Sequence, residues 1–75
     1  MDDGVPSYFS ARRAMFLTGA GRKRVEALPK HGPLKLVSRT DVEHRLLLGR
    51  RITVEDWDRV TVEIERAGRA AREAA

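Results

Sequence analysis

The carboxy-terminal part of the chain carries the feature that most constrains the fold, a long stretch with the periodicity of an amphipathic helix. From Thr53 onward, apolar side chains recur at alternating steps of three and four residues, which places them along one face of an α-helix. The positions on this face are Trp57, Val60, Ile64, Ala67, Ala71 and Ala74. Such a face is too short and too rich in alanine for an autonomous coiled coil, so we expect it to pack against the other helices of a small bundle.

Local signals mark both ends of this helix. Thr53 and Asp56 have the spacing of a capping box, in which each side chain bonds the other residue's amide. Toward the other end the apolar face becomes alanine and Gly68 interrupts it, which weakens the helix. We therefore expect residues 68–75 to fray unless another surface covers them.

Two shorter helices are predicted in the first half of the chain. Residues 8–18 carry apolar side chains at helical spacing, with Ser7 as the candidate amino-terminal cap and Gly19 as the residue that ends the helix. A second helix of two turns begins at residue 22 and ends before Pro29. The two helices are thus joined by a tight bend of only a few residues.

A third helix is predicted between this bend and the long helix. Ser38 and Thr40 are alternative amino-terminal caps, each followed three residues later by an acidic residue, and Gly49 marks the end. Residues 34–37 could be extended, but they have no obvious partner strand, so we interpret them as a connector.

Length and patterning together predict a small single-domain, all-α bundle of three to four helices. A chain of 75 residues forms one domain and buries only about 60% of the surface that its unfolded form exposes, so the core is small. Residues 1–7, which include Gly4 and Pro6, are expected to be a flexible tail. The predicted core residues are Phe9, Met15, Phe16, Val25, Leu28, Val42, Leu46, Trp57, Val60 and Ile64.

The composition argues against a membrane protein, a metal protein and an enzyme. No run of 18 apolar residues is present and the first residues lack the pattern of a secretory signal, so we expect a cytoplasmic location. The chain has no cysteine, and no acidic residues are arranged with His31 or His44 as ligands, so neither a metal nor a cofactor is expected. The glycines at positions 19 and 21 have the spacing of neither a P-loop nor a dinucleotide-binding fingerprint.

Positive charge is concentrated in the first half of the chain. Residues 1–40 contain eight Lys/Arg and three Asp/Glu, a net charge of +5, whereas residues 41–75 contain seven and eight, a net charge of −1. A local excess of this kind attracts polyanions, which indicates nucleic acid as the partner.

The bend between the first two helices is where this charge is densest. The glycines permit a sharp turn and are expected to leave the backbone N–H groups of residues 20–22 free at a helix start, where phosphate binds well. Arg22, Lys23 and Arg24 follow directly. Their side chains would add charge and hydrogen bonds to the same phosphates.

In this segment the sequence resembles the helix-hairpin-helix family of DNA-binding motifs, which hold a duplex without reading its bases. The residues that carry the resemblance are Gly19, Ala20, Gly21 and Lys23 in the hairpin pattern and Leu28 at the later aliphatic position. The resemblance implies that the hairpin amides and Lys23 contact phosphates.

We therefore expect a small nucleic-acid-binding accessory or regulatory protein that contacts the phosphate backbone, with DNA as the expected partner. The residues predicted to make these contacts are Arg12, Arg13, Gly19, Gly21, Arg22, Lys23, Arg24, Lys30, Arg50 and Arg51.

Other interpretations of these signals stay open. The glycines can simply cap and turn the chain beside a solvated basic face. Residues 42–57 are similar to a helix-turn-helix reader, although acidic residues occupy the second helix. The adjacent Leu46, Leu47 and Leu48 cannot all face inward on one helix. They would suit an adaptor, subunit or inhibitor that docks on a protein partner or a second copy through an apolar helix face.

Overall fold

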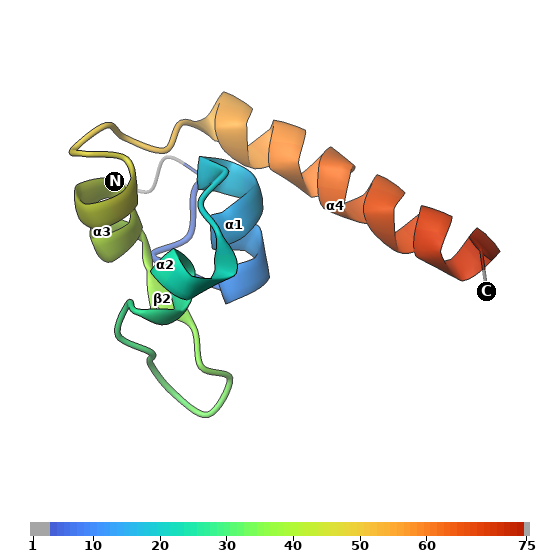
Figure 1. The fold of residues 1–75 in the computed structure, drawn as a ribbon. Coiled ribbons are helices and arrows are strands. Elements are labelled where there is room, and N and C mark those ends of the chain that lie inside the picture. The colour runs from blue at the N-terminus through green and yellow to red at the C-terminus, as the bar shows by residue number, and fades with distance from the viewer. Residues whose placement is uncertain (1–3, 75) are drawn as a thin grey trace.

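The computed structural model describes residues 4–74 and shows a mostly helical domain from which one long helix extends (Figure 1). The helices are α1 (Ala11–Thr18), α2 (Arg22–Glu26), α3 (Arg39–Asp41), the π-helical turn η1 (Val42–Leu46) and α4 (Val54–Ala74). The strands are β1 (Tyr8–Phe9) and β2 (Val37–Ser38). Of the predicted amino-terminal tail, residues 1–3 lie outside the described part.

A two-stranded antiparallel sheet corrects the prediction of a purely helical fold. Tyr8 pairs with Ser38, and Phe9 pairs with Val37. The first helix therefore begins at Ala11 rather than at residue 8, and Ser10, not Ser7, is its cap. The segment interpreted as a connector without a partner likewise ends in a strand. Both errors have one cause, because strand pairing joins residues about thirty positions apart and leaves no local periodicity to detect.

Three helix boundaries follow the predicted signals. Gly19 ends α1 in the left-handed conformation, with φ of 72°. Ser38 caps α3, since its Oγ accepts the backbone N–H of Asp41 at 3.0 Å. The capping box is also confirmed, because Thr53 and Asp56 bond each other's backbone N–H at 3.1 and 3.2 Å.

The third predicted helix does not run to Gly49. It widens into η1, where the backbone N–H of Leu47 reaches the carbonyl of Val42 at 3.1 Å, and the chain then leaves the helix. Leu48 and Gly49 both have positive φ, 54° and 93°, and the Gly49 N–H closes the turn on the Glu43 carbonyl at 2.8 Å. The wider turn keeps Leu46 and Leu47 half-buried and turns Leu48 to the solvent.

The core lies between α1, α2, η1, the small sheet and the first half of α4. The predicted core residues that are buried are Phe9, Val25, Leu28, Val42 and Val60. Those that pack at its edge, partly buried, are Met15, Phe16, Leu46, Trp57 and Ile64. The buried residues that the prediction left out are Val5, Ala14, Leu17, Ala20, Val37 and Ile52.

Val5 and Ile52 come from segments without regular structure, and one ion pair holds both segments in place. Arg39 and Glu43 pair at 2.9 Å. The Arg39 guanidinium also donates to the carbonyls of Val5 and Ile52, at 3.3 and 3.1 Å, while the Glu43 carboxylate accepts the Ile52 N–H at 2.8 Å. The chain before β1 and the chain before α4 are thus fastened to the same turn of helix.

Candidate nucleic-acid interface

The bend between α1 and α2 is built from local hydrogen bonds. The Thr18 hydroxyl donates to the Ala14 carbonyl at 2.8 Å and accepts the backbone N–H of Ala20 at 3.0 Å. Ala20 is buried and anchors the bend, and Gly21 continues in extended conformation as the cap of α2. The expectation of a free N–H at residue 20 is therefore wrong, because the Thr18 side chain satisfies it.

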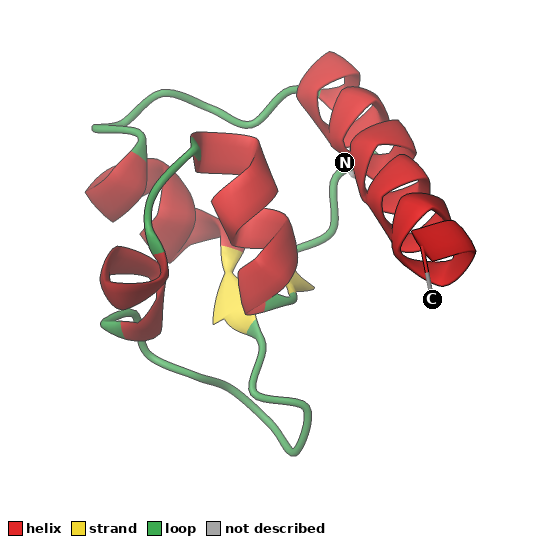
Figure 2. Ribbon diagram, turned by 45° about the vertical axis from the view of Figure 1, so that its right-hand side comes forward, coloured by secondary structure: helices red, strands yellow, loops and turns green. Residues whose placement is uncertain are grey.

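The bend turns the chain sharply, so that α2 is seen nearly end-on in Figure 2 where α1 is seen from the side. Val25 is fully buried and Leu28 is buried just after the helix, which fixes the inner face of α2 on the core. The opposite face consists of charged side chains in solvent. A short helix of this kind presents its cations on a rigid base.

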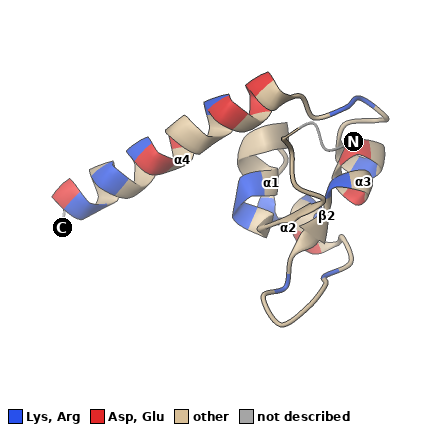
Figure 3. Cartoon of the chain, turned by 180° about the vertical axis from the view of Figure 1, so that it is seen from behind, with Lys and Arg blue, Asp and Glu red and all other residues tan. Residues whose placement is uncertain are grey.

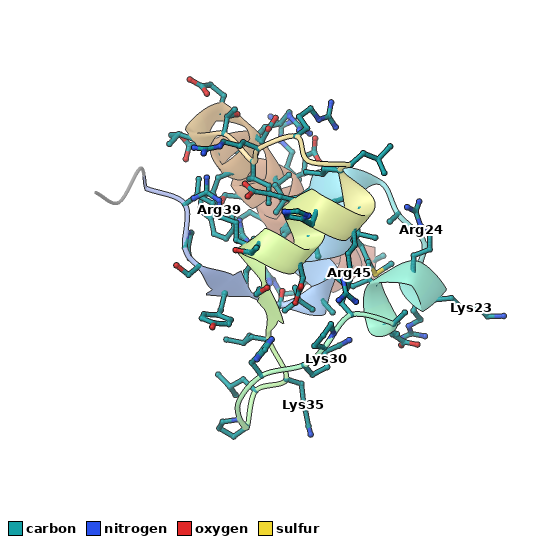
Figure 4. The ribbon with its side chains drawn as sticks, turned by 90° about the vertical axis from the view of Figure 1, so that its left-hand side faces the viewer. Lys23, Arg24, Lys30, Lys35, Arg39 and Arg45 are labelled. Atoms are coloured by element: carbon teal, nitrogen blue, oxygen red, sulfur yellow. The ribbon has the colours of Figure 1, made fainter. Side chains whose placement is uncertain are left out.

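Lys23 and Arg24 are the most available cations of α2. Neither has an ion-pair partner between residues 4 and 74, and Figure 4 shows both side chains extending away from the body of the domain. Arg22 pairs with Glu26 at 3.3 Å, with 80% and 59% of the two side chains exposed. A pair so exposed contributes little, so a phosphate can readily replace the carboxylate.

A groove lies between α1 and α2 beside these cations. It encloses about 480 Å³ and is lined by Ala11, Arg12, Met15, Arg22, Val25 and Glu26. Arg12 is exposed and its guanidinium lies 5.8 Å from the centre of the Phe16 ring. The groove thus has an apolar floor and guanidinium groups on both walls, which extends the basic surface from α2 onto α1.

A tight hairpin at residues 29–36 adds a further cation. The backbones of His31 and Leu36 exchange two hydrogen bonds, at 2.8 and 2.9 Å, and the Lys35 N–H donates to the Gly32 carbonyl at 3.1 Å. Lys35 has a φ of 55°, and Figure 4 shows its side chain projecting from the hairpin. Lys35 was not among the predicted contact residues; its only sequence signal is a lysine beside a Gly-Pro turn.

Arg45 was also missed by the sequence prediction. Figure 4 shows it on η1, on the side that faces α2, whereas Arg39 lies apart from this group near the amino-terminal strand. Arg45 pairs only loosely with Asp41, at 3.9 Å, and its side chain is exposed. We define the α2 basic surface by the six cations that share this side of the domain. They are Arg12, Arg22, Lys23, Arg24, Lys35 and Arg45.

Two of the predicted contact residues have structural partners instead. The Arg13 guanidinium lies 4.2 Å from the centre of the Trp57 ring and donates to the Thr61 hydroxyl at 2.7 Å, joining α1 to α4. The Lys30 ammonium donates to the carbonyls at the end of α2, those of residues 25, 26 and 28, at distances of 2.8–3.2 Å. Both cations are therefore committed within the domain.

Arg50 and Arg51 are exposed but do not join the α2 basic surface. They lie in the loop between η1 and α4, at the opposite end of the domain from the hairpin 29–36 (Figures 1 and 3). The acidic residues at the start of α4 lie near that end as well, as Figure 3 shows. The acidic start of α4 therefore does not cover α2.

Trp57, which could have served as a base-stacking side chain, is half-buried. Its ring lies 5.4 Å from that of Phe9 and carries Arg13 on its face. The face of α4 that contains it packs on the core, so the start of α4 is not presented as a second reading helix. The start of α4 therefore adds no contact residue to the α2 basic surface.

Among residues 4–74, none of the helices combines the length and the apolar character that crossing a lipid bilayer requires. In the same part of the chain, no three side chains of His, Cys, Asp or Glu gather closely enough to hold a metal ion. No protein-family model, curated protein or solved structure matches this chain.

Proposed function

We propose that this protein is a cytoplasmic nucleic-acid-binding accessory or regulatory protein that contacts the phosphate backbone of duplex DNA through the α2 basic surface. The observation that carries the proposal is the pair Lys23 and Arg24, exposed and without an ion-pair partner in the described chain, on a helix anchored by the fully buried Val25. Cations held this way are available to phosphates without breaking any contact inside the domain.

The arrangement of α1 and α2 supports duplex DNA in particular. The two helices are joined by only three residues, so α2 is held close to α1 with its charged face exposed, where its cations can approach the phosphates of a duplex. The resemblance to helix-hairpin-helix motifs also implies that the bend between α1 and α2 contacts phosphates. The hairpin 29–36 lies beside α2 and would bring Lys35 to the same backbone.

Salt dependence gives the first test. Six cations that each neutralise one phosphate would give a slope of log affinity against log salt of about −5, so the affinity would fall by about 10³ between 50 and 200 mM salt. The measurement is a fluorescence-anisotropy titration of labelled duplex over this range. A slope near zero would contradict the proposal.

A matched pair of variants then locates the surface. Lys23→Ala with Arg24→Ala should weaken duplex binding about 10- to 100-fold and reduce the magnitude of the salt slope by about 2. Arg66→Ala with Arg69→Ala removes the same charge from the far half of α4 and should leave the affinity within about threefold. Equal losses in both variants would mean that net charge, rather than this surface, attracts the DNA.

A second candidate function is favoured by Leu48. Its side chain is 88% exposed, at a position with φ of 54° just after η1. A large exposed apolar side chain held by a strained backbone suits a docking contact for a protein partner, as expected of an adaptor, subunit or inhibitor. Leu48→Asn removes the apolar side chain but keeps the turn, because asparagine readily adopts positive φ. If the variant shows the same molar mass by light scattering and the same binding to each candidate protein partner as the original chain, this alternative is wrong.

A further inference from the structure

The turn of the hairpin 29–36 presents apolar side chains to the solvent. Leu34 is 78% exposed, and the adjacent Pro33 is exposed as well. Gly32 and Lys35 flank these two residues with positive φ, 70° and 55°, so the chain reverses direction within four residues. We call residues 32–35 the hairpin tip. A single exposed leucine is ordinary on a protein surface, but this one differs from most in how it is held and in the charge around it.

The hairpin tip is fastened to the domain on both sides. Before the tip, the Lys30 ammonium donates to three carbonyls at the end of α2, at 2.8–3.2 Å, and the His31 ring lies 5.3 Å from that of Tyr8 in an edge-to-face contact. After the tip, Leu36 bonds back to His31 and leads directly into β2. The tip therefore has a fixed position relative to α2, which carries the available cations.

The segment around the tip is basic throughout. Residues 27–40 contain no acidic side chain and three basic ones, Lys30, Lys35 and Arg39. Lys35 directly follows Leu34, and Figure 4 shows its side chain projecting from the hairpin beside α2. An apolar side chain and a free cation thus reach the solvent from the same turn. No negative charge within this segment opposes the approach of a phosphate.

A duplex held by its phosphates can bury such an apolar side chain only between its stacked bases. Proteins that insert leucine or proline between two base pairs from the minor groove unstack that step and kink the duplex by about 20–90°. The minor groove is about 6 Å wide, so a tight turn enters it more readily than a helix does. A glycine and a proline keep the hairpin tip narrow.

An anionic lipid surface is the less suitable partner for the same tip. Even a myristoyl chain, which is much larger than one leucine and one proline, gives only marginal membrane binding. The cations of α2 on the same side of the domain match the phosphates of a duplex instead.

We propose that the hairpin tip is a wedge that inserts Leu34 between two base pairs and bends the duplex. This inference rests on the proposed function, because the α2 basic surface must first hold the phosphates. Burial of a leucine gains a free energy of the same order as the cost of unstacking one step, so the wedge changes the shape of the DNA more than the affinity. A duplex with a flexible TA step should bind about 3- to 10-fold more tightly than a stiff A-tract of equal length.

Circularisation of short DNA by a ligase measures the bend. A duplex of about 100 base pairs is shorter than the persistence length of about 150 and closes poorly by itself, so the original chain should raise the yield of circles at least about tenfold. In a second duplex, 2-aminopurine at a central TA step should brighten as that step unstacks. Leu34→Ala should abolish both effects while weakening binding less than about fivefold.

Two control variants accompany Leu34→Ala. Leu34→Met keeps a long apolar side chain and should retain both effects. Val62→Ala shortens another exposed apolar side chain, on α4 and away from the hairpin, and should also retain them (Figure 1).

The outcomes separate the wedge from the proposed function. Duplex binding with the expected salt slope, but without circles or brightening, overturns the wedge alone, whereas absence of duplex binding overturns both proposals. Circles formed equally well by Leu34→Ala also overturn the wedge. Sedimentation with vesicles of phosphatidylserine and phosphatidylcholine tests the other partner. If Leu34→Ala reduces vesicle binding and leaves circularisation unchanged, Leu34 contacts lipid and the wedge is wrong.

Discussion

The guanidinium of Arg39 and the carboxylate of Glu43 form an ion pair of 2.9 Å in which only 18% and 17% of the two side chains are exposed. The two residues lie one helical turn apart, yet the pair also forms hydrogen bonds to the backbone of Val5 and Ile52, which are distant in sequence. The Arg39–Glu43 pair therefore fixes the two irregular segments that supply Val5 and Ile52 to the core.

Glu43→Gln should destabilise the fold by about 2 kcal/mol, because it removes the negative charge that pairs with the largely buried Arg39 guanidinium and accepts the Ile52 N–H. The measurement is urea unfolding followed by circular dichroism. Glu63→Gln removes a carboxylate of the same type from an exposed pair with Arg59 and should cost less than about 0.5 kcal/mol. Equal losses in the two variants would show that burial does not strengthen the Arg39 pair.

Substitutions of the two adjacent arginines in α1 should have different effects, one on the stability of the fold and the other on DNA binding. Arg13→Ala removes the contact with the Trp57 ring and the bond to Thr61, so it should cost about 1–2 kcal/mol of stability and leave the salt slope of DNA binding unchanged. Arg12→Ala should leave the stability nearly unchanged and reduce the magnitude of the slope by about 1. Urea unfolding and anisotropy titrations on both variants check this, and an exchanged result would place Arg13, not Arg12, at the interface.

The capping box of α4 should make the stability of the fold depend on pH. The backbone N–H of Thr53, followed by its hydroxyl, lowers the pKa of the Asp56 carboxyl. A carboxylate with a lowered pKa contributes stability that is present above its ordinary pKa and is lost as the pH falls through the lowered value. The stability difference between the original chain and Asp56→Asn should therefore shrink between pH 5 and pH 2, and it should be less than about 1 kcal/mol at pH 7 because the side chain is partly exposed. Urea unfolding at several pH values measures it; a difference that is constant with pH would exclude the charged cap.

The two glycines of the bend should differ in their tolerance of a side chain. Gly19 has φ of 72°, so Gly19→Ala should cost about 1 kcal/mol although no atom lies within 4 Å of the new methyl group. Gly21 has φ of −72° and equally open space, so Gly21→Ala should leave the stability within about 0.5 kcal/mol. Thermal unfolding of the two variants is the measurement. A loss at Gly21 as large as that at Gly19 would contradict the described bend.

The predictable parts of the fold are those with local causes. Gly19 ends its helix, Ser38 begins the next, and the Thr53 and Asp56 pair starts α4, because each signal acts within four residues. The pairing of Phe9 with Val37 and the burial of Ile52 depend on contacts across the fold, so no local pattern revealed them.

The candidate interface divides in the same way. The basic run on α2 is contiguous in sequence and charged side chains favour solvent, so its exposure could be anticipated. Lys30 could not be assigned from spacing alone, because its long side chain folds back to the carbonyls at the end of α2. Lys35 and Arg45 join α2 only through the path of the hairpin and of η1, which periodicity does not describe.

The two backbone bonds between His31 and Leu36 close the hairpin within the free chain. The backbone of Lys35 is therefore held at a set separation from the cations of α2. Under the proposed function, a stiff polyanion whose charges repeat at a compatible interval would meet both groups of cations without rearrangement of the domain. A flexible one would first have to lose conformational entropy, and it would bind more weakly for the same number of charges.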